Sequence, residues 1–209
     1  MKSARVRDAI VDLDREQLRS FFEERGSRAR GAEPLTSVLY QDRHPEIARE
    51  RDRREVEKIL PMMRLDGQAR VLDIGCGIGR WAEHLGPRVG RGVGLDLSPD
   101  LIAFASARTF PVGWRFEALP AEQLSRDALA SLGLPLEFDL IIVAGVCISL
   151  NDDMLDAMFE GIDAVAAMGA QVSLREPVSV TGRLSLVNHW SEELGTHYNA
   201  IYRPAEELG

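Results

Sequence analysis

The sequence has 209 residues, of which 45% are hydrophobic and 28% charged, and its formal net charge is −8 at pH 7. This is ordinary globular composition, and the acidic balance disfavours a nucleic-acid partner, because affinity for phosphate backbones depends on clustered Lys and Arg. The two cysteines lack metal-ligand spacing, and the charged start lacks the apolar core of a secretory signal. No stretch reaches the about 18 apolar residues that a membrane span needs. These features predict a cytoplasmic protein with no membrane partner.

The N-terminal part predicts two helices separated by a loop. Residues 8–25 place apolar side chains at helical spacing, and Gly26 follows as a stop signal. Residues 26–46 are punctuated by Gly and Pro and predict a long loop. A second helix is predicted from Pro45, and its charged run RERDRREVEK is interpreted as a solvated face with ion pairs between successive turns. We interpret residues 1–55 as an N-terminal helical segment that forms a lid.

From residue 70 onwards, short apolar strands alternate with helical segments. Such alternation predicts an α/β fold with a doubly wound, mostly parallel sheet, and the uninterrupted run LIIVAGV predicts strands buried on both faces. Residues 56–209 are interpreted as one domain built on this sheet. The predicted strands cover residues 70–74, 92–97, 113–119, 138–147 and 170–178.

Smaller signals flank these strands. Ser98 is predicted to cap a helix that has Pro99 at its first position. Arg175 and Glu176, which close the fifth strand, are expected either to point at the mouth of the cleft or to form a structural ion pair, and the ion pair is the favoured interpretation. Beyond residue 178 the pattern is irregular, and RPAEELG at the end is interpreted as the start of a helix with Pro204 near its first position.

Three glycines, Gly75, Gly77 and Gly79, occupy alternate positions directly after the first strand. In a parallel sheet, ligands bind outside the carboxyl ends of the strands, and glycines at this turn let the backbone adopt positive φ and approach a ligand closely. The spacing differs from the G-x-G-x-x-G of dinucleotide-binding turns, and the Lys and Ser/Thr of a phosphate-binding loop are missing. The turn therefore predicts a ligand other than a dinucleotide.

Two carboxylates accompany the turn. Asp73 lies two residues before Gly75, where it can face a cationic ligand, and Asp96 ends the second strand, where an acid can accept both hydroxyls of a ribose. A tight glycine turn with two acids suits a nucleoside that carries a cationic amino acid better than one that carries phosphates.

With these features in place, VLDIGCGIGRWAEHL (71–85) and GVGLDLSPDLIAFA (92–105) resemble the class I S-adenosylmethionine-dependent methyltransferases. The resemblance covers residues 56–176 and implies a Rossmann-like methyltransferase fold, in which residues 56–209 bind S-adenosyl-L-methionine and release S-adenosyl-L-homocysteine. It also implies that the glycine turn, with Cys76 as a small buried residue, packs against the methionine part of the cofactor. Asp73 would then lie near the amino group and Asp96 at the ribose.

The resemblance implies further contacts along the same edge. Leu97 and the segment LPAEQL would lie at the adenine, and the strand exit AGV of FDLIIVAGVC would flank the sulfonium and the transferred methyl group. The implied cofactor-binding residues are Asp73, Gly75, Cys76, Gly77, Gly79, Asp96, Leu97, Ala121, Glu122, Ala144, Gly145 and Val146.

Candidates for catalysis lie outside the cofactor segments. His189 and His197, in the irregular C-terminal part, are candidate general bases for a hydroxyl acceptor, whereas an amine could bind in its neutral form. Tyr40 is a candidate lid residue that faces the acceptor, because small-molecule relatives often carry a tyrosine in an N-terminal lid. No constellation of metal ligands is apparent, so we predict a metal-independent reaction.

Together, the residues and the resemblance predict methyl transfer to a small-molecule acceptor, namely O- or N-methylation of a natural-product intermediate or a sugar. The exit AGVC differs from the Asn/Asp-Pro-Pro-Tyr motif of relatives that methylate nucleic-acid or protein amines. The alternative is a non-methylating S-adenosylmethionine-binding protein with a regulatory or other catalytic role. A nucleotide-sugar or nicotinamide enzyme with a degenerate turn is a third hypothesis.

The end of the chain carries one more expectation. Relatives continue with two strands after a helix like YRPAEEL, whereas nothing follows Gly209 here. We therefore expect the C-terminal strands of the family's sheet to be missing. The exposed edge of the fifth strand is expected to be covered by a homodimer contact or by further residues, because a bare apolar edge invites association.

Overall fold

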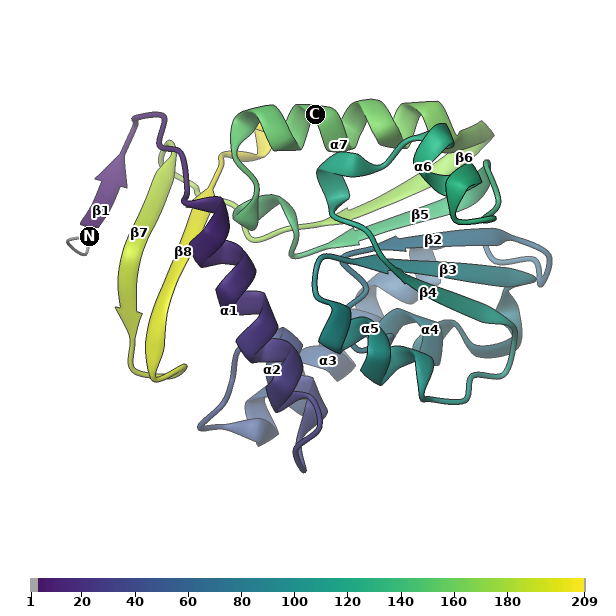
Figure 1. Ribbon diagram of the computed structural model, residues 1–209, viewed down its shortest axis with the longest axis horizontal. Coiled ribbons are helices and arrows are strands. Elements are labelled where there is room, and N and C mark those ends of the chain that lie inside the picture. Colours follow the sequence, from purple (N-terminus) through teal and green to yellow (C-terminus); the bar gives the residue numbers. More distant parts are fainter. Residues whose placement is uncertain (1–3, 209) are drawn as a thin grey trace.

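The computed structural model describes residues 4–208 and contains a central sheet of five parallel strands (Figure 1). The strands lie in the order β4-β3-β2-β5-β6, so the chain moves outward from β2 to β4 and then returns across β2 to β5 and β6. The predicted doubly wound sheet is confirmed, and ligands bind in such sheets at the point of reversal, here the exits of β2 and β5. The strands are β2 (Arg70–Ile74), β3 (Arg91–Asp96), β4 (Trp114–Ala118), β5 (Phe138–Ala144) and β6 (Ala166–Arg175).

Helices cover both faces of the sheet: α6 and α7 lie on one face, and α3, α4 and α5 on the other (Figure 1). Leu72 and Ile141 pack in the core beneath α7, whereas Val71 and Leu140 pack with α3 and α4. Because successive strand residues face opposite sides, the uninterrupted apolar runs fill two cores. The helices are α3 (Pro45–Ile59), α4 (Arg80–Leu85), α5 (Pro99–Ser106), α6 (Arg126–Ser131) and α7 (Asp152–Val165).

The predicted start of α5 is confirmed. Pro99 is its first residue, and the Ser98 hydroxyl oxygen accepts a hydrogen bond from the Leu101 N–H at 3.3 Å. This cap fixes the first turn of α5 directly after β3, and so fixes the direction in which the chain leaves Asp96.

The first long helix, α1 (Arg15–Arg28), is shifted from its predicted position. It begins at Arg15 because the Asp14 carboxylate accepts hydrogen bonds from two backbone N–H groups of the first turn, at 2.9 and 3.1 Å. Gly26 was predicted to end this helix and instead lies inside it. An added Cβ would lie 2.6 Å from the Cβ of Asp100, so glycine is needed here for the close approach of α1 to α5.

The segment predicted as a long loop contains a further short helix, α2 (Pro34–Leu39). Proline at its first position suits a helix start, because its missing N–H would be unpaired there in any case. The predicted domain boundary after residue 55 falls inside α3. The predicted lid therefore corresponds to α1 and α2 only, and its movement stays a prediction.

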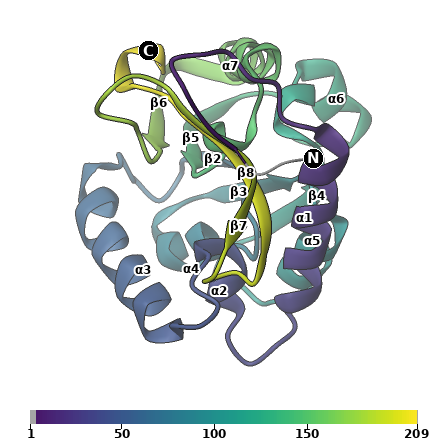
Figure 2. The same ribbon diagram turned by 90° about the vertical axis from the view of Figure 1, so that its left-hand side faces the viewer.

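A second sheet, of order β1-β7-β8, stands beside the central one, at the left in Figure 1 and toward the viewer in Figure 2. Its strands β1 (Ala4–Arg7), β7 (Leu184–Ser191) and β8 (Thr196–Tyr202) pair antiparallel. The sequence analysis missed them, because β1 has four residues and the pairing of β7 with β8 shifts register between Leu186 and His189. The helix predicted at Pro204 is a single 3-10 turn, Ala205–Glu207.

The outer edge of β6 pairs with no strand in the described part of the chain. The β7–β8 hairpin belongs to the second sheet and leaves this edge uncovered, so a homodimer contact there stays a prediction. Among residues 4–208, no helix is both long enough and apolar enough to cross a membrane.

Candidate active site

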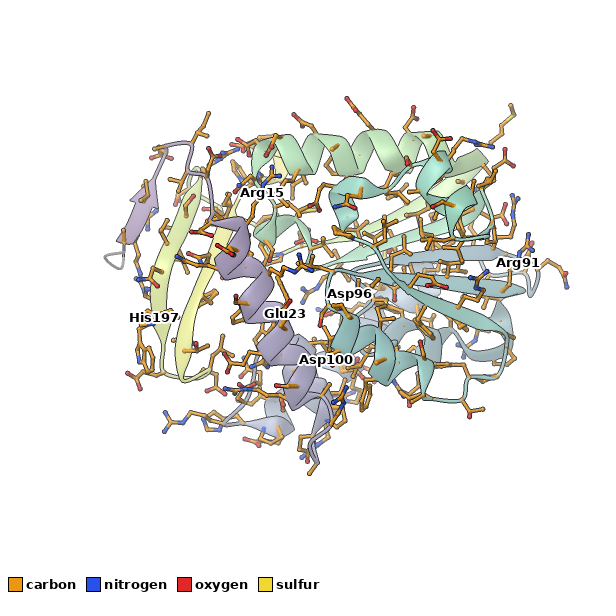
Figure 3. The ribbon with its side chains drawn as sticks, viewed as in Figure 1. Arg15, Glu23, Arg91, Asp96, Asp100 and His197 are labelled. Atoms are coloured by element: carbon orange, nitrogen blue, oxygen red, sulfur yellow. The ribbon has the colours of Figure 1, made fainter. Side chains whose placement is uncertain are left out.

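The carboxyl ends of the central strands open into a cavity of about 730 Å³. Its floor is formed by the residues that follow β2, β3 and β5, its cover by α1 and α2, and a side wall by β8. Figure 3 shows Asp96 between α1 and the central sheet. The cavity therefore lies where the topology of the sheet places a ligand.

The glycine turn after β2 has the conformation that its sequence predicts. Gly75, Gly77 and Gly79 have φ of +69°, +53° and +76°, the left-handed region that side chains disfavour. A Cβ at Gly75 would lie 2.4 Å from Cγ2 of Val146, and one at Gly77 would lie 2.6 Å from Cγ1 of Val38. The turn is thus in close contact with the exit of β5 on one side and with α2 on the other.

Asp96 links this turn to the next helix. One carboxylate oxygen accepts a hydrogen bond from the Gly77 N–H at 2.9 Å, and the other accepts one from the Ser98 N–H at 2.9 Å. Burial raises the pKa of the Asp96 carboxyl, and these two hydrogen bonds oppose the rise. Because Asp96 also lines the cavity, its remaining lone pairs can accept hydroxyl groups of a ligand.

Asp73 does not line the cavity, although the sequence analysis expected it near the ligand. Its side chain is 1% exposed and its Oδ2 atom has no hydrogen-bond partner among the described residues. Burial raises its pKa to about 8, with Arg80 opposing the rise and Asp96 adding to it. A buried acid of this kind is mostly protonated at neutral pH, so the structure assigns Asp73 a place beneath the turn and no contact with the cavity.

Ten of the twelve predicted cofactor positions line the cavity, and the exceptions are Asp73 and Gly79. Gly79 caps α4, and an added Cβ there would lie 2.9 Å from Cζ of Phe110. The ten are Gly75, Cys76, Gly77, Asp96, Leu97, Ala121, Glu122, Ala144, Gly145 and Val146.

The exit of β5 is fixed by the neighbouring strand. The Gly145 N–H donates to the Arg175 carbonyl oxygen at 2.9 Å, and the Val146 N–H donates to Oε1 of Glu176 at 2.7 Å. Burial raises the pKa of the Glu176 carboxyl. Arg175 and Glu176 therefore do not pair with each other as predicted; each holds a different group of the site.

Tyr40 lines the cavity from the end of α2. Its backbone is left-handed, with φ of +56°, and its ring lies edge-on to Phe21 at 5.9 Å between centroids and 5.4 Å from the Arg25 guanidinium carbon. Burial raises the pKa of the phenol, Asp96 and Glu176 raise it further, and Arg25 opposes them. The hydroxyl of Tyr40 therefore stays protonated at neutral pH and acts as a hydrogen-bonding group.

The sequence analysis missed Arg25, which holds the cover together. Its guanidinium is 1% exposed and donates to both carboxylate oxygens of Asp42 at 2.5 and 2.6 Å. It also donates to the carbonyl oxygens of Ser37, at 2.9 Å, and Thr36. Arg25 thereby ties α1 to the end of α2, and no periodic pattern in the sequence singles out this arginine from its neighbours.

The structure brings neither predicted histidine to the cavity. His189 lies in β7 against Tyr198, with 6.0 Å between ring centroids, and His197 is exposed against Trp190 at 5.1 Å. His197 lies in β8 beside the cavity-lining Tyr198 but does not itself line the cavity, and it lies away from Asp96 (Figure 3). A direct role of either imidazole as general base thus lacks the geometry it requires.

Two acids in the charged run of α3 are buried, where a solvated face was predicted. Asp52 and Glu55 accept hydrogen bonds from Arg80 at 2.8 and 2.7 Å, and the His84 ring nitrogen lies 2.9 Å from Asp52. Arg175 pairs with Glu55 at 2.9 Å. Only contact with α4 and β6 distinguishes these two acids from the other charges of the run, and the sequence pattern does not show that contact.

Within residues 4–208, no group of three or more His, Cys, Asp and Glu side chains is placed to hold a metal ion. The expectation of a metal-independent reaction stays a prediction.

Comparison with known proteins identifies the central region. Residues 71–169 match the family model described as a methyltransferase domain, and no curated protein matches the chain in sequence. Among solved structures, phosphoethanolamine N-methyltransferase 1 of Haemonchus contortus, with phosphoethanolamine and S-adenosylhomocysteine, has a TM-score of 0.64 at 18% identity. That match covers 80% of this chain but only 34% of the other, so this chain spans about a third of that enzyme.

Two further structures match over more of their length. A SAM-dependent methyltransferase of Leishmania major has a TM-score of 0.63 at 18% identity, covering 96% of this chain and 74% of the other. The DhpI–SAM–HEP complex has a TM-score of 0.61 at 19% identity, covering 92% and 84%. The chain therefore has the fold of class I S-adenosylmethionine-dependent methyltransferases, and its residues 71–169 match the methyltransferase domain.

Proposed function

We propose that the chain transfers the methyl group of S-adenosylmethionine to a small-molecule acceptor bound in the cavity beneath α1 and α2. The observation that carries the proposal is the convergence of ten cofactor positions, predicted from four separate sequence segments, on one cavity. Its volume of about 730 Å³ is within the range of roughly 300–1,000 Å³ that is usual for small-ligand sites.

The residues present fit the cofactor. The carboxylate of Asp96 is buried, lines the cavity and keeps lone pairs for ribose hydroxyls, and Gly75 and Gly77 bring backbone without a side chain to the cavity. When bound, S-adenosylmethionine supplies a methyl group already activated by a positively charged sulfur. The glycine turn and the exit of β5 would hold its methionine part, and Leu97, Ala121 and Glu122 its adenine.

The contribution of the protein would be alignment and exclusion of water. Holding two reactants in line can supply several kcal/mol without any further chemical group. The phenol of Tyr40, kept neutral by burial, can donate a hydrogen bond to the acceptor from the cover of the site. Bound S-adenosylmethionine would supply the methyl group to the acceptor lone pair, its sulfur would keep the electrons of the broken carbon–sulfur bond, and the acceptor proton would pass to solvent.

A small acceptor is supported by the aromatic cover and by the relatives. Phe21, Phe22 and Tyr40 close over the cavity from α1 and α2. One relative of the same fold is named for a small acceptor, phosphoethanolamine, and at 18% identity this shows that the fold accommodates one. We propose O- or N-methylation; natural-product intermediates and sugars are the first classes to screen.

The test is transfer of a radiolabelled methyl group from S-adenosylmethionine to a fractionated metabolite mixture, followed by mass analysis of the labelled product. Label is expected in a small molecule with the wild-type protein and with Asp100→Asn, a control on the exposed surface of α5. Much less label is expected with Asp96→Asn when the concentration of S-adenosylmethionine is limiting. Binding of S-adenosylhomocysteine without transfer to any fraction would favour the non-methylating alternative.

A further inference from the structure

One wall of the cavity carries more positive than negative charge. Arg51 of α3, Arg80 of α4 and Arg175 of β6 all line the cavity there. The carboxylates of this wall are Asp52 and Glu55, so three guanidinium groups face two carboxylates. The Asp52 carboxylate also contacts the ring of His84.

Arg51 is the unpaired member of this group. Arg80 pairs with Asp52 and Glu55, and Arg175 pairs with Glu55. Among residues 4–208, Arg51 has no carboxylate within 4.0 Å, and the hydrogen bond found for its side chain is from Nη1 to the Leu39 carbonyl oxygen at 3.2 Å. A guanidinium has five N–H donors, so most of those of Arg51 are open to a ligand.

The surroundings of Arg51 repel its charge. Burial and the neighbouring guanidinium groups of Arg175 and Arg80 lower the pKa of Arg51, and Glu55 opposes them. An anion placed between Arg51 and Arg175 would relieve this repulsion and accept hydrogen bonds of the charge-assisted kind, which are the strong ones.

The position of this wall favours the acceptor over the cofactor as the source of the anion. A Cβ at Gly145, beside the expected methyl position, would lie 4.0 Å from Nη1 of Arg175. Arg51 also interacts electrostatically with Tyr202 of β8, a strand that carries none of the predicted cofactor positions. The charged wall therefore lies on the side of the β5 exit away from Leu97 and the adenine segment.

We propose that the methyl acceptor carries an anionic oxygen group, a carboxylate or a phosphate-type oxyanion, and that Arg51 contacts this group beside Arg175. The proposal rests on the proposed methyl transfer and adds the acceptor's chemical class. Arg51 is then a specificity-determining residue, and acceptors without a negative charge bind poorly.

Anion binding tests the proposal separately from methyl transfer. Inorganic phosphate, acetate and neutral acetamide are titrated at constant ionic strength, with and without S-adenosylhomocysteine. Phosphate binding is measured by phosphorus NMR line broadening, and acetate and acetamide binding by proton saturation-transfer NMR. The proteins are wild type, Arg51→Gln, Arg51→Lys and the control Arg54→Gln. Glutamine removes the charge and keeps a polar side chain, and Arg54 is an exposed arginine of the same helix that pairs with Glu50.

Phosphate or acetate is expected to bind the wild-type and Arg54→Gln proteins, and acetamide is not. Arg51→Gln is expected to weaken anion binding by about tenfold or more, whereas Arg51→Lys keeps part of it and S-adenosylhomocysteine binding is unchanged in both. Binding of phosphate alone assigns a phosphate-type acceptor, and binding of acetate alone assigns a carboxylate.

Three outcomes overturn the proposal. In the first, neither anion binds the wild-type protein. In the second, Arg51→Gln binds the anion as well as the wild type does. In the third, Arg51→Gln weakens the binding of S-adenosylhomocysteine as strongly as it weakens the binding of the anion. The last outcome would assign the site to the carboxylate of the cofactor. Acetate against acetamide tests charge recognition on the wild-type protein alone, so the result does not depend on how well a variant folds. Failure of the proposed function shows instead as absent cofactor binding or absent methyl transfer.

Discussion

The carboxylate of Asp96 accepts a hydrogen bond from the backbone N–H of Gly77 at 2.9 Å, across 19 residues of sequence. The same carboxylate accepts the Ser98 N–H at the start of α5, and it lines the cavity. One acid thus fixes the shape of the glycine turn and offers the ligand an anionic acceptor. The two functions can be separated by experiment, because one is measured by stability and the other by affinity.

Asp96→Asn is expected to weaken the binding of S-adenosylhomocysteine by about tenfold or more, because hydrogen bonds to a charged acceptor contribute roughly 1.5–3 kcal/mol each. An asparagine would also turn its NH₂ group toward one of the two backbone donors. Isothermal titration calorimetry measures the affinity. Asp100→Asn serves as the control, and an unchanged affinity of Asp96→Asn would exclude Asp96 from the cofactor site.

Gly77→Ala is expected to be more harmful than Gly67→Ala. Both glycines have positive φ, +53° and +78°, so both substitutions carry a backbone strain of about 1–2 kcal/mol. Of these two positions, only Gly77 would bring the new Cβ against another group, Cγ1 of Val38 at 2.6 Å, whereas no atom of the described residues lies within 4 Å at Gly67. Urea unfolding measures the difference.

The excess cost at Gly77 is expected to disappear when Val38→Ala is combined with Gly77→Ala, because alanine removes the methyl groups that the new Cβ meets. The strain common to both glycine positions remains. A cost of Gly77→Ala that is the same in the Val38→Ala background as in the wild type would show that α2 does not press on the turn in solution.

Arg25→Met is expected to destabilise the fold by about 3 kcal/mol or more, because it removes the buried donor to the Ser37 carbonyl oxygen and leaves the partly buried Asp42 carboxylate with Arg28 as its remaining partner. Arg28→Met is the matched control. Arg28 also pairs with Asp42, but its side chain is 39% exposed, and exposed pairs contribute less than about 1 kcal/mol. Equal effects of the two substitutions on urea unfolding would contradict the anchoring role of Arg25.

The sequence predicted the parts of this molecule in which local chemistry decides the structure. The glycine turn, the Ser98 cap and the apolar strands follow from backbone freedom, capping and burial within a few residues of each other. The hairpin of β7 and β8 was missed, because its pairing is interrupted at Asn188, where φ is +47° and the alternation of the strand is broken.

The residues of the candidate site were likewise predicted where local sequence and topology place them, and missed where helix packing does. The residues on the strand exits were predicted, because topology alone places them at one edge. Arg25, Arg51 and the buried acids of α3 were missed, because their environment depends on how the helices of the N-terminal segment pack against the sheet. The two histidines were predicted on residue type alone, and both lie in the second sheet without lining the cavity.

The buried carboxyl of Asp73 is expected to make the fold less stable as the pH rises. Its pKa is raised to about 8 in the folded protein from an ordinary 3.8, so the folded state holds a proton that the unfolded state releases. Between these two pH values the unfolded state therefore binds fewer protons, and stability falls with pH by at most about 1.4 kcal/mol per pH unit. Below pH 3.8 both states are protonated and this contribution vanishes. Asp73→Asn has no such proton. Its free energy of unfolding relative to that of the wild type, measured with urea and without cofactor, is expected to rise from acid to about pH 8 and then level off. Parallel pH profiles of the two proteins would show that Asp73 is ionised in the folded state.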